Sequence, residues 1–170
     1  MNTKKSKGIP VFTKQEIDII ASKVSEYPLA DSILIMLYTG IRIDELLNIK
    51  SSDIDLSSRI IKVHSEKTSR TRNVPIHTAI IPYIEKRLSN EFLYELDGEK
   101  IESTQYQKNF FMPFMSSLNM NHSVHIARHT FSKTMSTYTS AEVLNAICDY
   151  SNKDVPIATL ISEIDKLMYM

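Results

Sequence analysis

The sequence is short of several features that would identify particular classes of protein. Its 170 residues include a single cysteine, Cys148, which excludes a disulfide framework and a cysteine-based zinc site. Its net charge is zero, because 20 basic residues balance 20 acidic ones. The longest apolar stretches, such as residues 33–38, are far too short to span a bilayer. No apolar run follows the N-terminal lysines, so we expect no signal peptide and a soluble, cytoplasmic protein.

The composition is that of an ordinary globular protein. Hydrophobic residues make up 42% and charged residues 24% of the chain, so it can bury a core and is not disordered throughout. The length suits one domain. Residues 1–87 carry 14 basic and 10 acidic side chains, a net +4, whereas residues 88–170 carry 6 and 10, a net −4. A basic half can bind a polyanion, although ordinary scatter of surface charge explains the asymmetry equally well.

Apolar spacing predicts a mainly helical α+β domain with a small antiparallel β-hairpin. A capping box at Thr13 and Glu16 opens the first helix, and Gly40 ends the second. Alternating β-branched residues predict two strands joined by a basic turn. The expected helices cover about residues 14–26, 30–38, 43–50, 78–89, 103–118 (kinked at Pro113), 126–138, 141–149 and 155–168; the strands cover 59–64 and 73–76, with a third strand and turn within 92–101. We expect residues 1–11 to form a flexible basic arm and residues 12–170 to form the domain.

Three separated segments carry side chains suited to chemistry on a phosphodiester. They are Thr39–Leu47, which reads T-G-I-R-I-D-E-L-L, the turn that contains Lys67, and His125–Phe131, which reads H-I-A-R-H-T-F. The guanidiniums of Arg42 and Arg128 can clamp the non-bridging oxygens of a phosphate, and they stay charged at any working pH. Lys67 can protonate a leaving 5′-oxygen as a general acid. His125 can hydrogen-bond the phosphate or handle the proton of a nucleophile.

These three segments resemble the catalytic domain of the tyrosine recombinases, also called phage integrases. The family pattern reads T-G-[LI]-R-x-x-E-L, then a Lys in a K-T-G-like hairpin turn before V-P-[LI], then H-x-[LA]-R-H-T-F. The chain has all three in order, with Lys67-Thr68-Ser69 followed by Val74-Pro75-Ile76. The resemblance implies a helical catalytic domain that binds duplex DNA and cleaves and rejoins strands through a 3′-phosphotyrosine, with no metal or other cofactor. It implies catalytic roles for Arg42, Lys67, His125 and Arg128.

The chain departs from this pattern at its C-terminal end. The family continues as L-G-H-S-x-x-x-T-T-x-x-Y, in which His or Trp supports the phosphate and Tyr is the nucleophile. The matching segment here reads Cys148-Asp149-Tyr150-Ser151, so Tyr150 stands in the His/Trp position, and the nucleophile position falls near Thr159. Tyr169 is the remaining candidate, about ten residues too late. Either a longer connection carries Tyr169 into its own or a neighbour's site, or the chain cannot cleave DNA.

Simpler interpretations of the same residues stay open. Arg42 could cap a helix and pair with Glu45, Lys67 could be a solvated turn lysine, and His125 with Arg128 could be a polar pair at a helix start. If the resemblance holds, DNA contacts are expected from the basic residues of the first, second and third segments: Arg42, Lys67, Arg70, Arg72 and Arg128. His64, His77 and His122 show no partner spacing and are expected on the surface.

Three functions are therefore compatible with the sequence. The first is a site-specific recombinase or integrase, the second is a nucleophile-deficient DNA-binding relative, and the third is a type IB topoisomerase-like nicking enzyme. The family usually carries a further N-terminal helical domain, so the chain is either an excised fragment or a naturally short homologue. The apolar stripe of residues 157–168 also suits self-association. In all three cases Arg42, His125 and Arg128 are expected to converge on one concave, basic surface.

Overall fold

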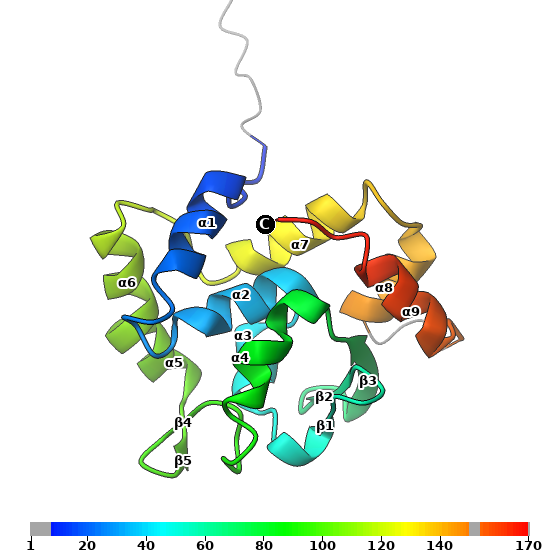
Figure 1. The fold of residues 1–170 in the computed structure, drawn as a ribbon, viewed down its shortest axis with the longest axis horizontal. Coiled ribbons are helices and arrows are strands. Elements are labelled where there is room, and N and C mark those ends of the chain that lie inside the picture. The colour runs from blue at the N-terminus through cyan, green and yellow to red at the C-terminus, as the bar shows by residue number, and fades with distance from the viewer. Residues whose placement is uncertain (1–7, 150–153, 170) are drawn as a thin grey trace, which may run out of the picture.

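The computed structural model describes residues 8–149 and 154–169, which form helices around two small antiparallel sheets (Figure 1). The mainly helical α+β prediction is confirmed. The longer helices are α1 (Lys14–Ser22), α2 (Ala30–Thr39), α7 (Ile126–Met135), α8 (Ala141–Cys148) and α9 (Ile157–Ile164). The shorter ones are α3 (Ile43–Leu47), η1 (Ser51–Asp53), η2 (Thr78–Ile80), α4 (Ile81–Glu85), α5 (Ser103–Tyr106), η3 (Gln107–Phe111) and α6 (Met112–Ser117). Within the described ranges, no helix combines the length and apolar character needed to cross a membrane.

Helix α2 forms the centre of the core. All ten of its residues are buried, and it packs against both α1 and α7. Figure 1 shows it crossing the middle of the molecule between α1 and the β-hairpin. Its one buried charge, Asp31, accepts hydrogen bonds from Arg87 Nε at 3.0 Å and from the Tyr94 hydroxyl at 2.9 Å. A buried carboxylate is tolerated only with such partners, which here fix the loop after α4 to the core.

The predicted β-hairpin is confirmed as strands β2 (Ile60–Ser65) and β3 (Arg70–Pro75). The register pairs Ile60 with Pro75 and Ser65 with Arg70. Strand β1 (Ile54–Asp55) extends this sheet, and β4 (Glu95–Leu96) pairs with β5 (Glu99–Lys100) in the second sheet. Alternate residues of β2 face the core, so the period of two buries one side of the hairpin. The turn between the two strands of the hairpin is exposed to solvent.

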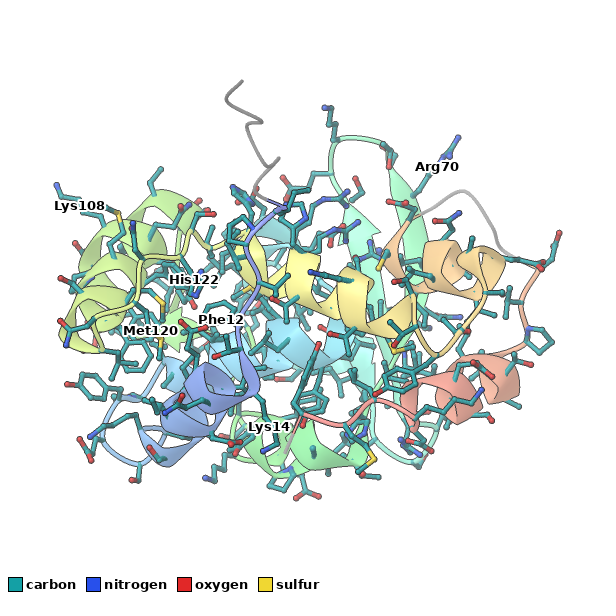
Figure 2. The ribbon with its side chains drawn as sticks, turned by 90° about the horizontal axis from the view of Figure 1, so that it is seen from above. Phe12, Lys14, Arg70, Lys108, Met120 and His122 are labelled. Atoms are coloured by element: carbon teal, nitrogen blue, oxygen red, sulfur yellow. The ribbon has the colours of Figure 1, made fainter. Side chains whose placement is uncertain are left out.

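The segment before α1 is fixed to α7 and to the loop that precedes it. The backbone N–H of Phe12 donates to Thr130 Oγ1 at 2.9 Å, and the rings of Phe12 and His122 lie 4.3 Å apart (Figure 2). His122 Nε2 also lies 3.1 Å from Glu16. The prediction that His122 is a surface residue is therefore wrong, because its partner is distant in sequence. The predicted arm lies largely outside the described residues.

Several helix boundaries differ from the sequence prediction. The Thr13–Glu16 capping box is present, but α1 ends at Ser22. The helix expected over 103–118 is divided into α5, a π-helical turn η3 and α6. Pro113 has no N–H to donate to the carbonyl four residues earlier, and widening of the preceding turn accommodates the ring. Helix α9 ends at Ile164 rather than at 168, and the chain continues without helix to Tyr169.

The C-terminal segment packs on the chain's own hairpin. Helix α9 contacts β3 and α8, and it buries Leu160 and Ile164. After the helix, Asp165 accepts hydrogen bonds from both Nη atoms of Arg59, at 3.1 Å for the Nη1–Oδ2 bond. Arg59 Nε donates to the Ile76 carbonyl at 2.9 Å, so this pair joins α9 to the sheet edge.

The first prediction concerns Gly40, which ends α2 in the left-handed region at φ +69°. A Cβ there would lie 2.8 Å from Cε1 of Phe131 and 3.2 Å from Sγ of Cys148. We expect Gly40→Ala to lower the free energy of unfolding by about 2–4 kcal/mol, because backbone strain adds to overpacking. Urea denaturation measures the loss.

Gly98→Ala is the matched control. Gly98 has φ +78°, but among the described residues no atom lies within 4 Å of the position that a Cβ would take there. Only the conformational cost of about 1 kcal/mol is expected at this site. Equal losses for the two variants would contradict the close approach of α7 to Gly40.

Candidate active site

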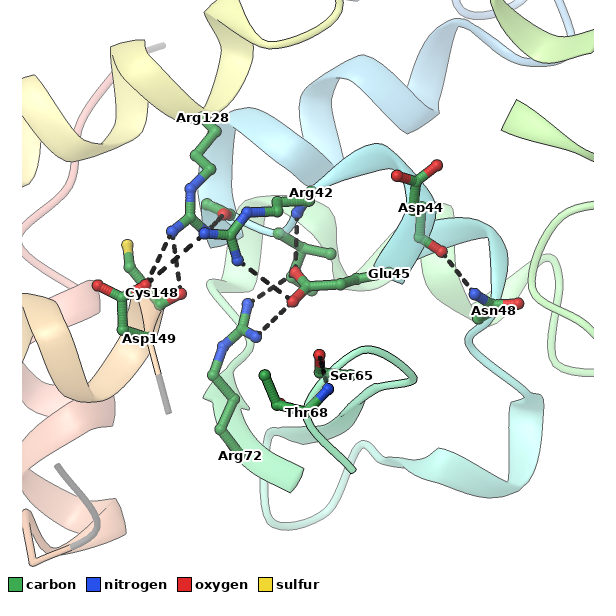
Figure 3. A network of polar contacts seen from close by, with 12 residues as sticks. Arg42, Asp44, Glu45, Asn48, Ser65, Thr68, Arg72, Arg128, Cys148 and Asp149 are labelled. Carbon is green, nitrogen blue, oxygen red and sulfur yellow. Dashed lines mark hydrogen bonds and ion pairs between the residues drawn. The ribbon is translucent and has the colours of Figure 1, made fainter. Parts of the chain in front are cut away.

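The guanidiniums of Arg42 and Arg128 meet at one carboxylate, although they come from distant parts of the chain (Figure 3). Arg42 lies immediately before α3 and Arg128 on the first turn of α7. The Nη2 atom of Arg128 is 3.3 Å from Asp149 Oδ1, and the Nη2 atom of Arg42 is 3.7 Å from the same oxygen. The structure therefore brings together the two arginines that the sequence assigned to one phosphate. We call the guanidiniums of Arg42 and Arg128 the arginine clasp.

Arg128 is oriented by two backbone carbonyls. Its Nη1 donates to the Gly40 carbonyl at 2.8 Å, and its Nη2 donates to the Cys148 carbonyl at 3.0 Å. The side chain is 19% exposed, and this burial lowers the pKa of Arg128. The guanidinium stays charged at neutral pH because its ordinary pKa is so high. The carbonyls at the C-terminal ends of α2 and α8 therefore hold one edge of the Arg128 guanidinium.

Arg42 is held less tightly. Its backbone N–H donates to Glu45 Oε2 at 3.0 Å, and its Nη1 lies 3.5 Å from Glu45 Oε1. The side chain remains 46% exposed. Arg42 therefore stands at the start of α3 and pairs with Glu45, as in the simpler interpretation, and it also contacts Asp149. Exposure leaves this guanidinium able to reorient toward an added anion.

Glu45 and Arg72 form a buried ion pair behind the clasp. Arg72 donates through Nη1 to Oε1 at 2.7 Å and through Nη2 to Oε2 at 2.9 Å. Its Nε donates to the Ile147 carbonyl at 2.7 Å. The side chains are 4% and 9% exposed. Arg72 therefore does not lie at the cationic surface of the hairpin, where the sequence interpretation placed it, because its side chain points into the core from β3.

An open cleft of about 900 Å³ lies between α3, the hairpin turn and the segment around residues 100–103. Lys67 and Arg70 are exposed on its hairpin side, and Figure 2 shows Arg70 projecting outward from the start of β3. The charged lining residues are Arg42, Lys67, Arg70 and Lys100, together with Asp44, Glu45, Glu66, Glu102 and Asp149. The cleft is thus mixed in charge, whereas the sequence led us to expect a basic surface.

The histidines are placed differently from one another. His125 is exposed at the N-cap position of α7, three residues before Arg128 and therefore on the same side of the helix. His64 also lines the cleft, and its ring nitrogens lie 2.8 Å from Thr71 Oγ1 and 3.3 Å from Asp53 Oδ1. Sequence reasoning missed the partners of His64, because one of them comes from the turn before β1. His77 packs against Tyr38 with ring centroids 4.7 Å apart.

Neither of the two candidate tyrosines is placed beside the clasp by a described contact. Tyr150 lies outside the described residues. Tyr169 is 5% exposed, and its ring packs edge-on against Tyr38 at a centroid distance of 5.0 Å. Burial raises the pKa of Tyr169, although its interaction with Thr134 opposes the shift. Thr159, at the expected nucleophile position, is exposed on α9.

Comparison with known proteins identifies the family of the chain. Residues 11–155 match the phage integrase family. The chain belongs to this family. It is 31% identical over 118 residues to a protein of Acholeplasma phage L2 described as a "Probable integrase/recombinase", a match that spans 66% of this chain and 40% of that protein. It is 40% identical over 92 residues to the tyrosine recombinase XerC of Bacillus pumilus, a match that spans 48% of this chain and 30% of that protein.

Solved integrase structures share the fold of this family member. The integrase of mycobacterium phage Brujita superposes with a TM-score of 0.76 at 16% identity, over 98% of this chain and 61% of that one. The Tn1549 transposon integrase in complex with circular intermediate DNA gives 0.71 at 19% identity, over 96% and 62%. The chain spans less than half of the curated relatives it matches. Among its described residues, no group of three or more His, Cys, Asp or Glu is arranged to hold a metal ion.

The second prediction concerns the buried ion pair. Glu45→Gln removes the carboxylate charge that pairs with the buried Arg72 guanidinium, and we expect the free energy of unfolding to fall by about 3 kcal/mol. Chemical denaturation measures it. The control is Glu91→Gln, which breaks the exposed Lys50–Glu91 pair at 3.1 Å and is expected to cost less than about 1 kcal/mol. Similar small losses in both variants would show that the Glu45–Arg72 pair does not hold the site together.

Proposed function

We propose that the chain binds duplex DNA through one backbone phosphate, which accepts hydrogen bonds from both Arg42 and Arg128. The observation that carries the proposal is the convergence of both guanidiniums on a single carboxylate oxygen. A phosphate oxygen accepts the same charge-assisted hydrogen bonds from the same donors. Membership of the phage integrase family supports DNA as the source of that phosphate.

Lys67 in the cleft and His125 at the start of α7 suit the chemistry of strand transfer. Negative charge develops on the non-bridging oxygens during attack on a phosphodiester, and the two guanidiniums can stabilise it. Lys67 lies on the exposed hairpin turn, from which it can protonate the leaving 5′-oxygen. His125 lies on the side of α7 that carries Arg128 and can hydrogen-bond the phosphate. We therefore propose that the fold serves site-specific recombination or integration through a 3′-phosphotyrosine intermediate.

The burial of Tyr169 favours the second candidate, a relative that binds DNA without cleaving it. A phenol must be placed in line with the scissile phosphate and deprotonated as it attacks. Tyr169 is buried against Tyr38, and its raised pKa makes deprotonation harder. Release of the segment after α9 from this position, or its exchange with a neighbouring protomer, is required before Tyr169 can act. Self-association through the apolar stripe of α9 also remains a prediction, because such an exchange would require it.

Relatives supply further support for DNA as partner. One solved Tn1549 integrase structure is a complex with circular intermediate DNA, and a lambda integrase structure is a tetramer bound to a Holliday junction. Their identity to this chain is 19% and 16%, so the likeness extends to the fold alone.

A type IB topoisomerase-like nicking activity uses the same kind of residues. An assay for strand exchange between two duplexes, compared with one for relaxation of supercoiled DNA, distinguishes it from recombination.

The third prediction concerns the salt dependence of DNA binding. With about 4–6 neutralised phosphates, the logarithm of the binding constant is expected to fall with log salt at a slope of about −4 to −5. Arg70→Ala should make this slope shallower by about one, because one phosphate contact is lost. Lys108→Ala is the control, because Figure 2 shows Lys108 at the opposite end of the molecule from Arg70. Fluorescence anisotropy with a short duplex measures both, and a slope near zero contradicts electrostatic binding.

The fourth prediction concerns cleavage. We expect the isolated chain to form little or no covalent adduct with a nicked suicide substrate, because Tyr169 is buried away from solvent. Denaturing gel electrophoresis separates adduct from free DNA. An adduct that forms efficiently at low protein concentration and disappears in Tyr169→Phe would show that Tyr169 is the working nucleophile. An adduct that appears only as protein concentration rises would indicate exchange of the C-terminal segment.

A further inference from the structure

We propose that Asp149 is an internal substitute for the DNA phosphate, which occupies the arginine clasp when DNA is absent and limits its affinity for DNA. This inference rests on the proposed function, because it assumes that the clasp receives a backbone phosphate. It assigns a role to a residue that the family pattern does not use, since a glycine stands at this position in L-G-H.

The position of the carboxylate is set by its own backbone. The N–H of Asp149 donates to the Asn145 carbonyl at 2.8 Å and closes the C-terminal end of α8. From there Oδ1 lies 3.3 Å from Arg128 and 3.7 Å from Arg42 (Figure 3). The side chain is 48% exposed. The carboxylate is therefore accessible to solvent while it contacts both guanidiniums, so an incoming phosphate can compete with it for them.

The local charge explains why this carboxylate matters. Three arginines, Arg42, Arg72 and Arg128, face two carboxylates, Glu45 and Asp149, so one positive charge remains. Glu45 is engaged by both Nη atoms of Arg72 in the interior. Asp149 is thus the carboxylate that opposes the two arginines of the clasp at the surface. Replacement by a neutral side chain removes the negative charge that lies nearest to both guanidiniums of the clasp among these residues.

Asp149 is not needed to hold the arginines in place. Arg128 already donates to the carbonyls of Gly40 and Cys148. Arg42 is already fixed through its backbone and side-chain contacts to Glu45. Contacts other than those to Asp149 therefore keep Arg128 in place and keep Arg42 at the start of α3, where its exposed guanidinium can turn toward a phosphate, when the charge of Asp149 is removed. This distinguishes a competing anion from a structural counter-ion, whose removal would disorder the arginines and weaken binding.

The test compares Asp149→Asn with the wild-type chain in equilibrium binding to a 20-base-pair duplex over a range of salt. We expect binding about five- to tenfold tighter at low salt, with a salt slope steeper by about one, because one more phosphate contact becomes available. Asp149→Gly, which restores the glycine of the pattern, should act in the same direction. Thermal unfolding of both variants should stay close to wild type, since Asp149 is half exposed.

Asp44→Asn is the matched control. Asp44 lines the same cleft and is exposed, but no contact between its carboxylate and an arginine is found in the described part of the chain. It removes the same charge without opening the clasp, so affinity should rise less than about twofold. An equal gain in Asp44→Asn and Asp149→Asn would overturn the inference in favour of a general effect of charge.

The two proposals fail in different ways. If the wild-type chain binds DNA with the expected salt dependence but both Asp149 variants bind equally or more weakly, the internal-phosphate role is wrong and the proposed function stands. If neither the wild type nor any variant binds DNA even at low salt, the proposed function is wrong, and the role of Asp149 falls with it.

Discussion

The buried ion pair between Glu45 and Arg72 is the interaction on which the geometry of the site depends. Its two charges come from α3 and β3, and Arg72 also bonds the carbonyl of Ile147 near the end of α8. Three elements that are far apart in the sequence are therefore joined at one point. A buried pair of this kind contributes little net stability compared with an apolar core, but loss of one partner is costly. Its main consequence here is position, because Arg42 immediately precedes α3 and the end of α8 carries a carbonyl that holds Arg128.

Around this fixed pair the site combines rigid and adjustable parts. Arg128 is mostly buried and held by carbonyls, whereas Arg42 is half exposed and Lys67 lies on a solvent-exposed turn. A rigid arginine sets where a phosphate binds, and the adjustable groups close on it afterwards, with the ordering cost falling on few side chains. The acidic residues of the cleft weaken its electrostatic attraction for the DNA backbone. Affinity for DNA is then sensitive to each acidic residue near the clasp, above all to Asp149.

The sequence predicted the elements more accurately than the orientation of particular side chains. Helix α2 and the hairpin follow from local patterns, an apolar run ended by Gly40 and a period of two. The inward direction of Arg72 had a signal of the same kind, because it is two residues from buried Val74 on one face of β3. The strand predicted from the sequence begins at Asn73 and therefore leaves Arg72 in the basic turn. The partners of His122 and the burial of Tyr169 depend on contacts between distant segments, such as Glu16 and Tyr38, which no local pattern specifies.

In the proposed complex, Arg42 and Arg128 together bind one DNA phosphate while Arg72 remains paired with Glu45. Nuclear magnetic resonance of the arginine side-chain nitrogens during titration with a short duplex tests this arrangement directly. We expect the guanidinium signals of Arg42 and Arg128 to shift together and saturate at the same DNA concentration, while that of Arg72 stays unchanged. Shifts confined to the hairpin arginine Arg70, with Arg42 and Arg128 unaffected, would contradict it.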